Sequence, residues 1–165
     1  MSYFIILRGP AGVGKTTIAR ELARLLHGCH ISFDRILREQ NLDYVPGDLC
    51  VPECKMLAAN KIIIPLAQEK LAAGQVVIFD GNFYHKAQLD DLIKQLKFPH
   101  GVFTLKTSLE ECLVRNKTRT NPLDEQEVKN VFALVAKFDY GDVIDTTGHT
   151  IDAVVRKIKN ILVSI

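Results

Sequence analysis

A run of eight residues near the N-terminus has the spacing of a phosphate-binding loop. Its pattern is G-x-x-x-x-G-K-[ST], directly after an apolar segment and directly before an amphipathic one. The matching residues are Gly9, Pro10, Ala11, Gly12, Val13, Gly14, Lys15 and Thr16. Glycine lets the backbone fold closely around a phosphate, so successive N–H groups can point at one anion. The positive end of the following helix dipole favours the same anion.

The side chains of this run supply the rest of the chemistry. We expect Lys15 to reach the β- and γ-phosphates of ATP and Thr16 to offer its hydroxyl to Mg²⁺, with Thr17 also at the nucleotide. The alternative is a chance glycine-rich turn, but the apolar strand before it and the helix after it favour the phosphate site. The sequence therefore predicts a P-loop that binds a nucleotide.

Two absences narrow the reaction. A GTPase usually carries Asn-Lys-x-Asp to read guanine, but here Asn116-Lys117 is followed by Thr118-Arg119. Motor ATPases often place a glutamate beside the metal-binding aspartate, and none adjoins Asp80. Both absences favour transfer of a phosphoryl group to an acceptor other than water.

Asp80 ends an apolar strand, the position at which ligands of an open α/β sheet gather. It is a candidate Mg²⁺ ligand together with Thr16, and we expect Asp80 and Asn82 to face the substrate. The alternative for Asp80 is a turn-forming residue before Gly81.

Asp34 closes the second predicted strand in the same way, and Arg38 follows it on the substrate side. A carboxylate there could accept the proton of an attacking hydroxyl and hold it in line with the γ-phosphate. The alternative is that Asp34 caps the following helix, a role that aspartate performs well.

A basic cluster, Arg115 to Arg119, lies at the end of a predicted helix, before the breaker Thr120-Asn121-Pro122. Cations stabilise a helix C-terminus in any protein. Phosphoryl transfer also needs positive charge over the transferring group, which a mobile segment carrying Arg115 and Arg119 would bring.

Strand-like and helix-like segments alternate, which predicts an α/β fold with a parallel sheet covered on both faces. The expected strands are 3–7, 29–33, 76–79, 102–105 and 143–144. The expected helices are 15–27, 34–40, 54–73, 86–97, one starting after Ser108, 124–137 and 151–165. Pro65 should start, kink or divide its helix. His27 and His30 should flank a turn, and 41–54 should be irregular.

The chain has 165 residues, which fits one domain, 1–165, with an acceptor-side segment at about 35–60 and a lid at about 115–123. The net charge of +2 gives no strong basic surface for nucleic acid. The apolar runs are too short for a signal peptide or a membrane span. We therefore expect a cytoplasmic protein without a membrane partner, either a monomer or a homodimer.

With these motifs the chain resembles the small P-loop kinases, which include shikimate, gluconate and adenylate kinases, and most of all the polynucleotide-kinase and zeta-toxin-like branch. The segments that carry the resemblance are the P-loop, Ile31–Arg38, Asp80–Asn82 and Arg115–Arg119. The resemblance implies a three-layer α/β/α fold with strand order 2-3-1-4-5. It also implies Asp34 as general base, Arg115 near the adenine, Arg119 on the phosphates and Thr146–Thr150 near the base.

The sequence thus predicts an ATP-dependent phosphotransferase that uses Mg²⁺. It would move the γ-phosphate to a hydroxyl or phosphate of a small molecule or nucleotide. Two alternatives stay open: a 5′-hydroxyl nucleic-acid kinase, and a non-catalytic module that senses ATP.

Overall fold

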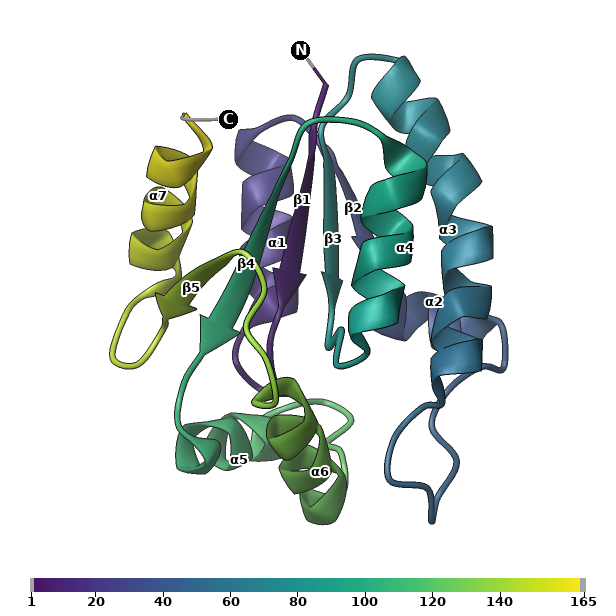
Figure 1. The fold of residues 1–165 in the computed structure, drawn as a ribbon. Helices are drawn as coiled ribbons and strands as arrows, with labels where there is room; N and C mark the ends of the chain where they lie inside the picture. The colour runs from purple at the N-terminus through teal and green to yellow at the C-terminus, as the bar shows by residue number, and fades with distance from the viewer. Residues whose placement is uncertain (1, 164–165) are drawn as a thin grey trace.

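The computed structural model describes residues 2–163 and arranges them around a five-stranded parallel sheet (Figure 1). The strands are β1 (Phe4–Arg8), β2 (Cys29–Ser32), β3 (Val77–Gly81), β4 (His100–Lys106) and β5 (Asp142–Asp145). Their order is β2-β3-β1-β4-β5, which confirms the expected fold class and topology. Ile165, expected at the end of the last helix, lies outside the described residues.

Helices cover both faces of the sheet and its carboxyl edge. They are α1 (Lys15–Leu25), α2 (Phe33–Glu39), α3 (Glu53–Ala72), α4 (Lys86–Leu96), α5 (Leu109–Lys117), α6 (Glu125–Val135) and α7 (Ile151–Leu162). α1 and α7 pack on one face, and α3 and α4 pack on the other. Figure 1 shows α5 and α6 beyond the carboxyl ends of β1 and β4. Within residues 2–163, no helix combines the length and apolar character needed to cross a bilayer.

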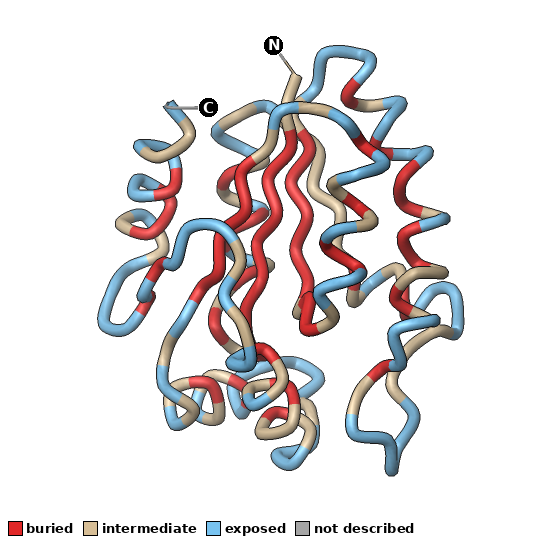
Figure 2. The backbone as a smooth tube through the Cα atoms, in the orientation of Figure 1, coloured by how far each residue is buried: buried red, intermediate tan, exposed pale blue. Residues whose placement is uncertain are grey.

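The central strand β1 is buried along its whole length, as its continuous apolar sequence predicts (Figure 2). Its alternate residues enter two separate cores. Phe4 and Ile6 pack toward α3 and α4, while Ile5 and Leu7 pack toward α1 and α7. β1 therefore fixes the loop that follows it relative to both helical layers.

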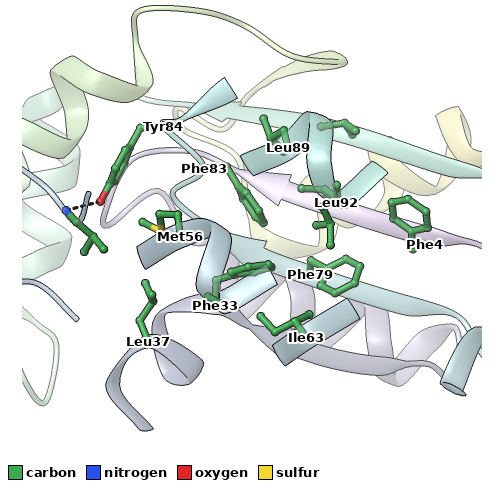
Figure 3. Close-up of a cluster of buried hydrophobic side chains, with 14 of the residues drawn as sticks. Phe4, Phe33, Leu37, Met56, Ile63, Phe79, Phe83, Tyr84, Leu89 and Leu92 are labelled. Atoms are coloured by element: carbon green, nitrogen blue, oxygen red, sulfur yellow. Dashed lines mark hydrogen bonds between the residues drawn. The ribbon is translucent and has the colours of Figure 1, made fainter. Parts of the chain in front are cut away.

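Aromatic rings fill much of the core beneath α3 and α4 (Figure 3). The rings of Phe33 and Phe83 meet edge to face with centroids 4.8 Å apart, and Phe79 lies 6.1 Å from Phe33. Such edge-to-face pairs stabilise beyond the area that they bury. Because Phe33 starts α2 and Phe83 follows β3, this packing fixes both segments at the carboxyl edge of the sheet.

Arg8, at the end of β1, is completely buried, although the predicted strand stopped at Leu7. Its guanidinium donates to the carbonyl oxygens of Val135 (3.1 Å) and Phe138 (2.8 Å), and its carbon lies 4.3 Å from the centroid of the Phe138 ring. Burial lowers the pKa of Arg8 to about 10, and the charge of Asp139 opposes that shift. The interaction ties the strand that precedes the P-loop to the C-terminal end of α6.

The structure refines two local predictions. Of the three effects expected of Pro65, it neither starts nor divides its helix, since α3 runs unbroken from Glu53 to Ala72. Proline removes one N–H from the helix, but Pro65 and Lys61 are both exposed, so water can satisfy the freed Lys61 carbonyl. The second strand ends at Ser32, one residue early, because Phe33 already belongs to α2 and packs in the core.

Phe79→Ala should destabilise the protein by about 3–5 kcal/mol, since it leaves a cavity at a completely buried site in a central strand. Urea unfolding followed by circular dichroism would measure the loss. Leu66→Ala is the control, because Leu66 is 49% exposed on α3 and its truncation should change the free energy of unfolding by less than about 0.5 kcal/mol. Equal stability of the two variants would contradict this core.

Candidate active site

The glycine-rich loop connects β1 to α1 and packs tightly against α5. Gly12 and Gly14 have φ of +87° and +101°, a region that favours glycine. A Cβ on Gly12 would lie 2.6 Å from the carbonyl oxygen of Cys112 in α5. Any larger residue at position 12 would therefore separate the loop from α5.

Lys15 is 6% exposed, and its ammonium folds back onto the loop. It donates to the carbonyl oxygens of Gly9 (2.9 Å) and Pro10 (2.8 Å) and to Oδ1 of Asn82 (3.1 Å). Burial lowers the pKa of Lys15, while the charges of Asp34 and Asp80 oppose that change. The two carbonyls hold the Lys15 ammonium at the loop. A bound phosphate could take their place as the hydrogen-bond partner of the ammonium.

Thr16 and Asp80, expected to act together, are in direct contact. The Thr16 hydroxyl donates to Oδ2 of Asp80 at 2.6 Å, and Nε2 of His30 lies 2.6 Å from Oδ1. Asp80 is completely buried. Burial alone would raise its pKa, but the hydrogen bonds from His30 and Thr16, together with the charge of Lys15, hold the pKa of Asp80 below its usual range. The carboxylate is therefore kept ionised beside the P-loop.

His30 is a site residue that the sequence analysis missed, because it lies within β2 rather than at a turn. Ser32 is the register partner of Asp80, and His30, two residues earlier, points to the same face of the sheet. Only the parallel pairing of β2 with β3 brings His30 to Asp80.

Asp34 lies in the first turn of α2, where Ser32 occupies the N-cap position, so Asp34 does not cap this helix. Its side chain lines the cleft described below. Burial raises the pKa of Asp34, and the charge of Lys15 is the largest effect that opposes the rise. A carboxyl group with a raised pKa beside a P-loop lysine is suited to take up a proton.

A cleft of about 770 Å³ opens beside the P-loop, at the carboxyl edge of the sheet. Of the residues singled out from the sequence, those that line it are Thr17, Asp34, Arg38, Asn82 and Arg119. Asp80 does not line it, because it is buried behind Thr16 and His30, so the expected direct contact of Asp80 with a substrate has no support in this geometry.

The irregular segment at one side of the cleft is anchored through the backbone of Val51. The N–H of Val51 donates to the Tyr84 hydroxyl (3.0 Å; dashed in Figure 3), and Nε2 of His85 bonds the Val51 carbonyl (2.9 Å). Since a carbonyl only accepts, Nε2 of His85 carries a proton here. Tyr84 and His85 closely follow Asn82, so the segment around Val51 is fixed relative to the partner of Lys15.

The hairpin of α5 and α6 carries the two arginines singled out from the sequence. Nη1 of Arg115 donates to the carbonyl of Val13 at 3.1 Å, and Nη2 pairs with Glu111. The loop between the helices is closed by Asn116, whose side-chain amide bonds both the N–H (3.0 Å) and the carbonyl (2.8 Å) of Leu123. Arg119 lies in this loop, exposed and facing the cleft.

Arg115 does not line the cleft and instead lies near the start of α7, which follows β5. An atom at the Cβ position of Gly14 would lie 3.9 Å from both Arg115 and Ile151. The hydroxyls of Thr107 and Thr147 are 3.4 Å apart. These contacts bring Arg115 and the segment Thr146–Thr150 to the same end of the loop.

Residues 4–137 match the family model AAA_33, described as an AAA domain. The chain belongs to this family. This chain is 31% identical over 162 residues to a Pyrococcus furiosus protein named "Putative adenylate kinase". The match covers 96% of this chain and 83% of that protein. This chain is 30% identical over 169 residues to a protein of Pyrobaculum calidifontis named "Cytidylate kinase", covering 90% of each. With these relatives and its phosphate-binding loop, the chain is a P-loop kinase.

This chain also superposes on a solved sugar kinase from Janibacter sp. HTCC2649, with a TM-score of 0.80 and 14% sequence identity. The superposition covers 97% of this chain and 94% of that one. A likeness at this identity shows the shared fold alone.

Asp34→Asn should make the ligand-free protein more stable at neutral pH. Because the folded-state pKa of Asp34 is raised, the native state holds the proton more tightly than the unfolded chain, and stability is lost as the pH rises through that pKa. Asparagine is uncharged at every pH and avoids the loss, so the advantage should shrink toward acidic pH.

Thermal unfolding of both proteins from acidic to neutral pH would measure this difference. Glu39→Gln is the matched control, because Glu39 lies on the same helix and pairs with Arg35 at the surface. If the Asp34→Asn variant were less stable than wild type at neutral pH, the interpretation would be contradicted.

Proposed function

We propose that this kinase transfers the γ-phosphate of ATP to a small-molecule or nucleotide acceptor bound in the cleft. The observation that carries the proposal is the position of Asp34, in the cleft and within electrostatic reach of the buried P-loop lysine. Lys15 would exchange the carbonyls of Gly9 and Pro10 for the β- and γ-phosphates, while the loop N–H groups hold the phosphate oxygens.

The residues beside the P-loop also fit Mg²⁺. The Thr16 hydroxyl and the ionised Asp80 are oxygen ligands, the type that Mg²⁺ prefers. Within residues 2–163 no group of three or more His, Cys, Asp or Glu side chains could hold a metal by itself. Mg²⁺ commonly binds through one or two protein ligands plus phosphates and water, so this small donor set suits it. When bound, the ion would neutralise charge on the β- and γ-phosphates.

We propose the remaining roles from the resemblance and from the positions of these residues. Asp34 would take the proton of an acceptor hydroxyl and orient its oxygen toward the γ-phosphorus. Arg119 would bring positive charge to the transferring group from the loop between α5 and α6, which would act as a lid. Arg115, with the segment Thr146–Thr150, would lie at the nucleotide base. Arg38 and Asn82 would contact the acceptor. We propose that the protein acts in the cytoplasm.

The test is ADP formation with Mg²⁺ and a panel of nucleosides, nucleotides, sugars and 5′-hydroxyl oligonucleotides. Asp34→Asn should lower kcat by about 100-fold or more and leave the affinity for ATP unchanged, because a general base acts in the transition state. Glu39→Gln is again the control, since it removes an exposed carboxylate from the same helix. Normal turnover by the Asp34→Asn variant would remove Asp34 as the base, and transfer to oligonucleotides alone would replace the small-molecule acceptor with nucleic acid.

A further inference from the structure

Three carboxylates from separate segments face the cleft. Asp34 is on α2, Asp43 is in the segment between α2 and α3, and Glu127 is on α6. Burial raises the pKa of Glu127, the charges of Asp43, Asp124 and Asp34 raise it further, and the charge of Arg119 opposes the rise. Three carboxylates thus line one cleft, with Asp34 the one within reach of the P-loop lysine.

The cations that line the cleft are Arg20, Arg38 and Arg119. In the proposed reaction Arg119 serves the transferring phosphate of ATP. On the acceptor side, two arginines, Arg20 and Arg38, then face three carboxylates. Burial raises the pKa of Asp34, and the charge of Arg38 lowers it. Lys55 bonds the backbone carbonyl of Asp43 at 3.4 Å but does not line the cleft. The three arginines and three carboxylates of the cleft are balanced in number, and the carboxylates are in excess on the acceptor side once ATP engages Arg119.

This balance distinguishes the two kinds of acceptor. A monophosphate carries nearly two negative charges at neutral pH, so it needs cations beside it and no base, because its oxygen is already ionised. A hydroxyl is a poor nucleophile until a base takes its proton. Asp34 would repel a phosphate but would activate a hydroxyl, so its place in the cleft favours the hydroxyl.

The other carboxylates are free to recognise the rest of such an acceptor. Oδ1 of Asp43 accepts from the N–H of Tyr44 at 2.7 Å, which leaves its second oxygen available. The Glu127 carboxylate makes no hydrogen bond to any residue in 2–163. Carboxylates accept from hydroxyl and ammonium groups, and Tyr44 and Tyr84 add aromatic surface to the same cleft.

We propose that the acceptor is a polyol or amino alcohol that carries no phosphate, with Asp34 as its base and Asp43 and Glu127 as its specificity residues. The inference rests on the proposed phosphotransfer and names the substrate class for it. The hydroxyl proton passes to Asp34 while the acceptor oxygen bonds the γ-phosphorus. The bond from that phosphorus to the β,γ-bridging oxygen breaks, and ADP leaves with the electron pair.

Matched acceptors test the proposal: adenosine and cytidine against their 5′-monophosphates, and glucose and glucosamine against their 6-phosphates. The phosphate-free group should contain the substrate, with at least about tenfold higher kcat/KM than its phosphorylated partner. Asp43→Asn and Glu127→Gln should each raise the acceptor KM without changing the KM for ATP. Glu125→Gln, which changes an exposed residue in the first turn of the same helix α6, should change neither.

A second measurement needs no knowledge of the acceptor. Diadenosine pentaphosphate and its adenosine–cytidine counterpart span an ATP site and a monophosphate site. Calorimetry should show that neither binds much more tightly than ATP. Binding about 100-fold tighter than ATP, or conversion of AMP or CMP to the diphosphate, would overturn the hydroxyl acceptor while leaving the kinase proposal intact. No transfer to any acceptor with ATP binding preserved would overturn both.

Discussion

The burial of the Lys15 ammonium is the constraint on which the rest of this site depends. A cation with 6% exposure must be satisfied by the protein, and here two loop carbonyls and the Asn82 amide oxygen do so. Asp34 and Asp80 add opposing charge at longer range. Each of these groups comes from the carboxyl edge of the sheet, so the strand order that gathers them there is also what makes a buried lysine tolerable.

A second buried cation extends that arrangement to the hairpin of α5 and α6. Arg8 and Lys15 flank the P-loop, one at the end of β1 and the other at the start of α1. Arg8 bonds the carbonyls at the C-terminal end of α6, while Gly12 allows α5 to touch the loop. One contact thus holds α5 and the other holds α6 close to the phosphate site. The loop that carries Arg119 connects these two helices. Movement of that loop would leave the two contacts in place.

What the sequence predicted well was local. The P-loop is a contiguous pattern whose flanking strand and helix are visible in the periodicity, and the strand order came with the resemblance that the pattern carries. The burial of Arg8 is not predictable from the sequence, because charged residues are rarely buried and no pattern indicates a cation in the core. The sequence predicts Asp34 at the end of a strand because Phe33 has the apolar character of a strand residue, although Phe33 packs as the first residue of a helix.

The rest of the site depends on pairings between distant segments. His30 meets Asp80 across 50 residues through the register of β2 with β3, and Val51 meets Tyr84 and His85 across more than 30. No local pattern encodes such contacts. The segment 41–52 has no periodicity from which its partners could be inferred, yet it forms one wall of the cleft.

The most direct test of the account is calorimetric titration of Mg·ATP into the wild-type protein and into Lys15→Met, which keeps most of the apolar stem and removes the charge. We expect the wild type to bind and the folded variant to lose about 100-fold or more in affinity, because the buried ammonium is the cation that meets the phosphates. Equal affinity of the two proteins for Mg·ATP would show that the phosphates bind elsewhere and would contradict the central claim.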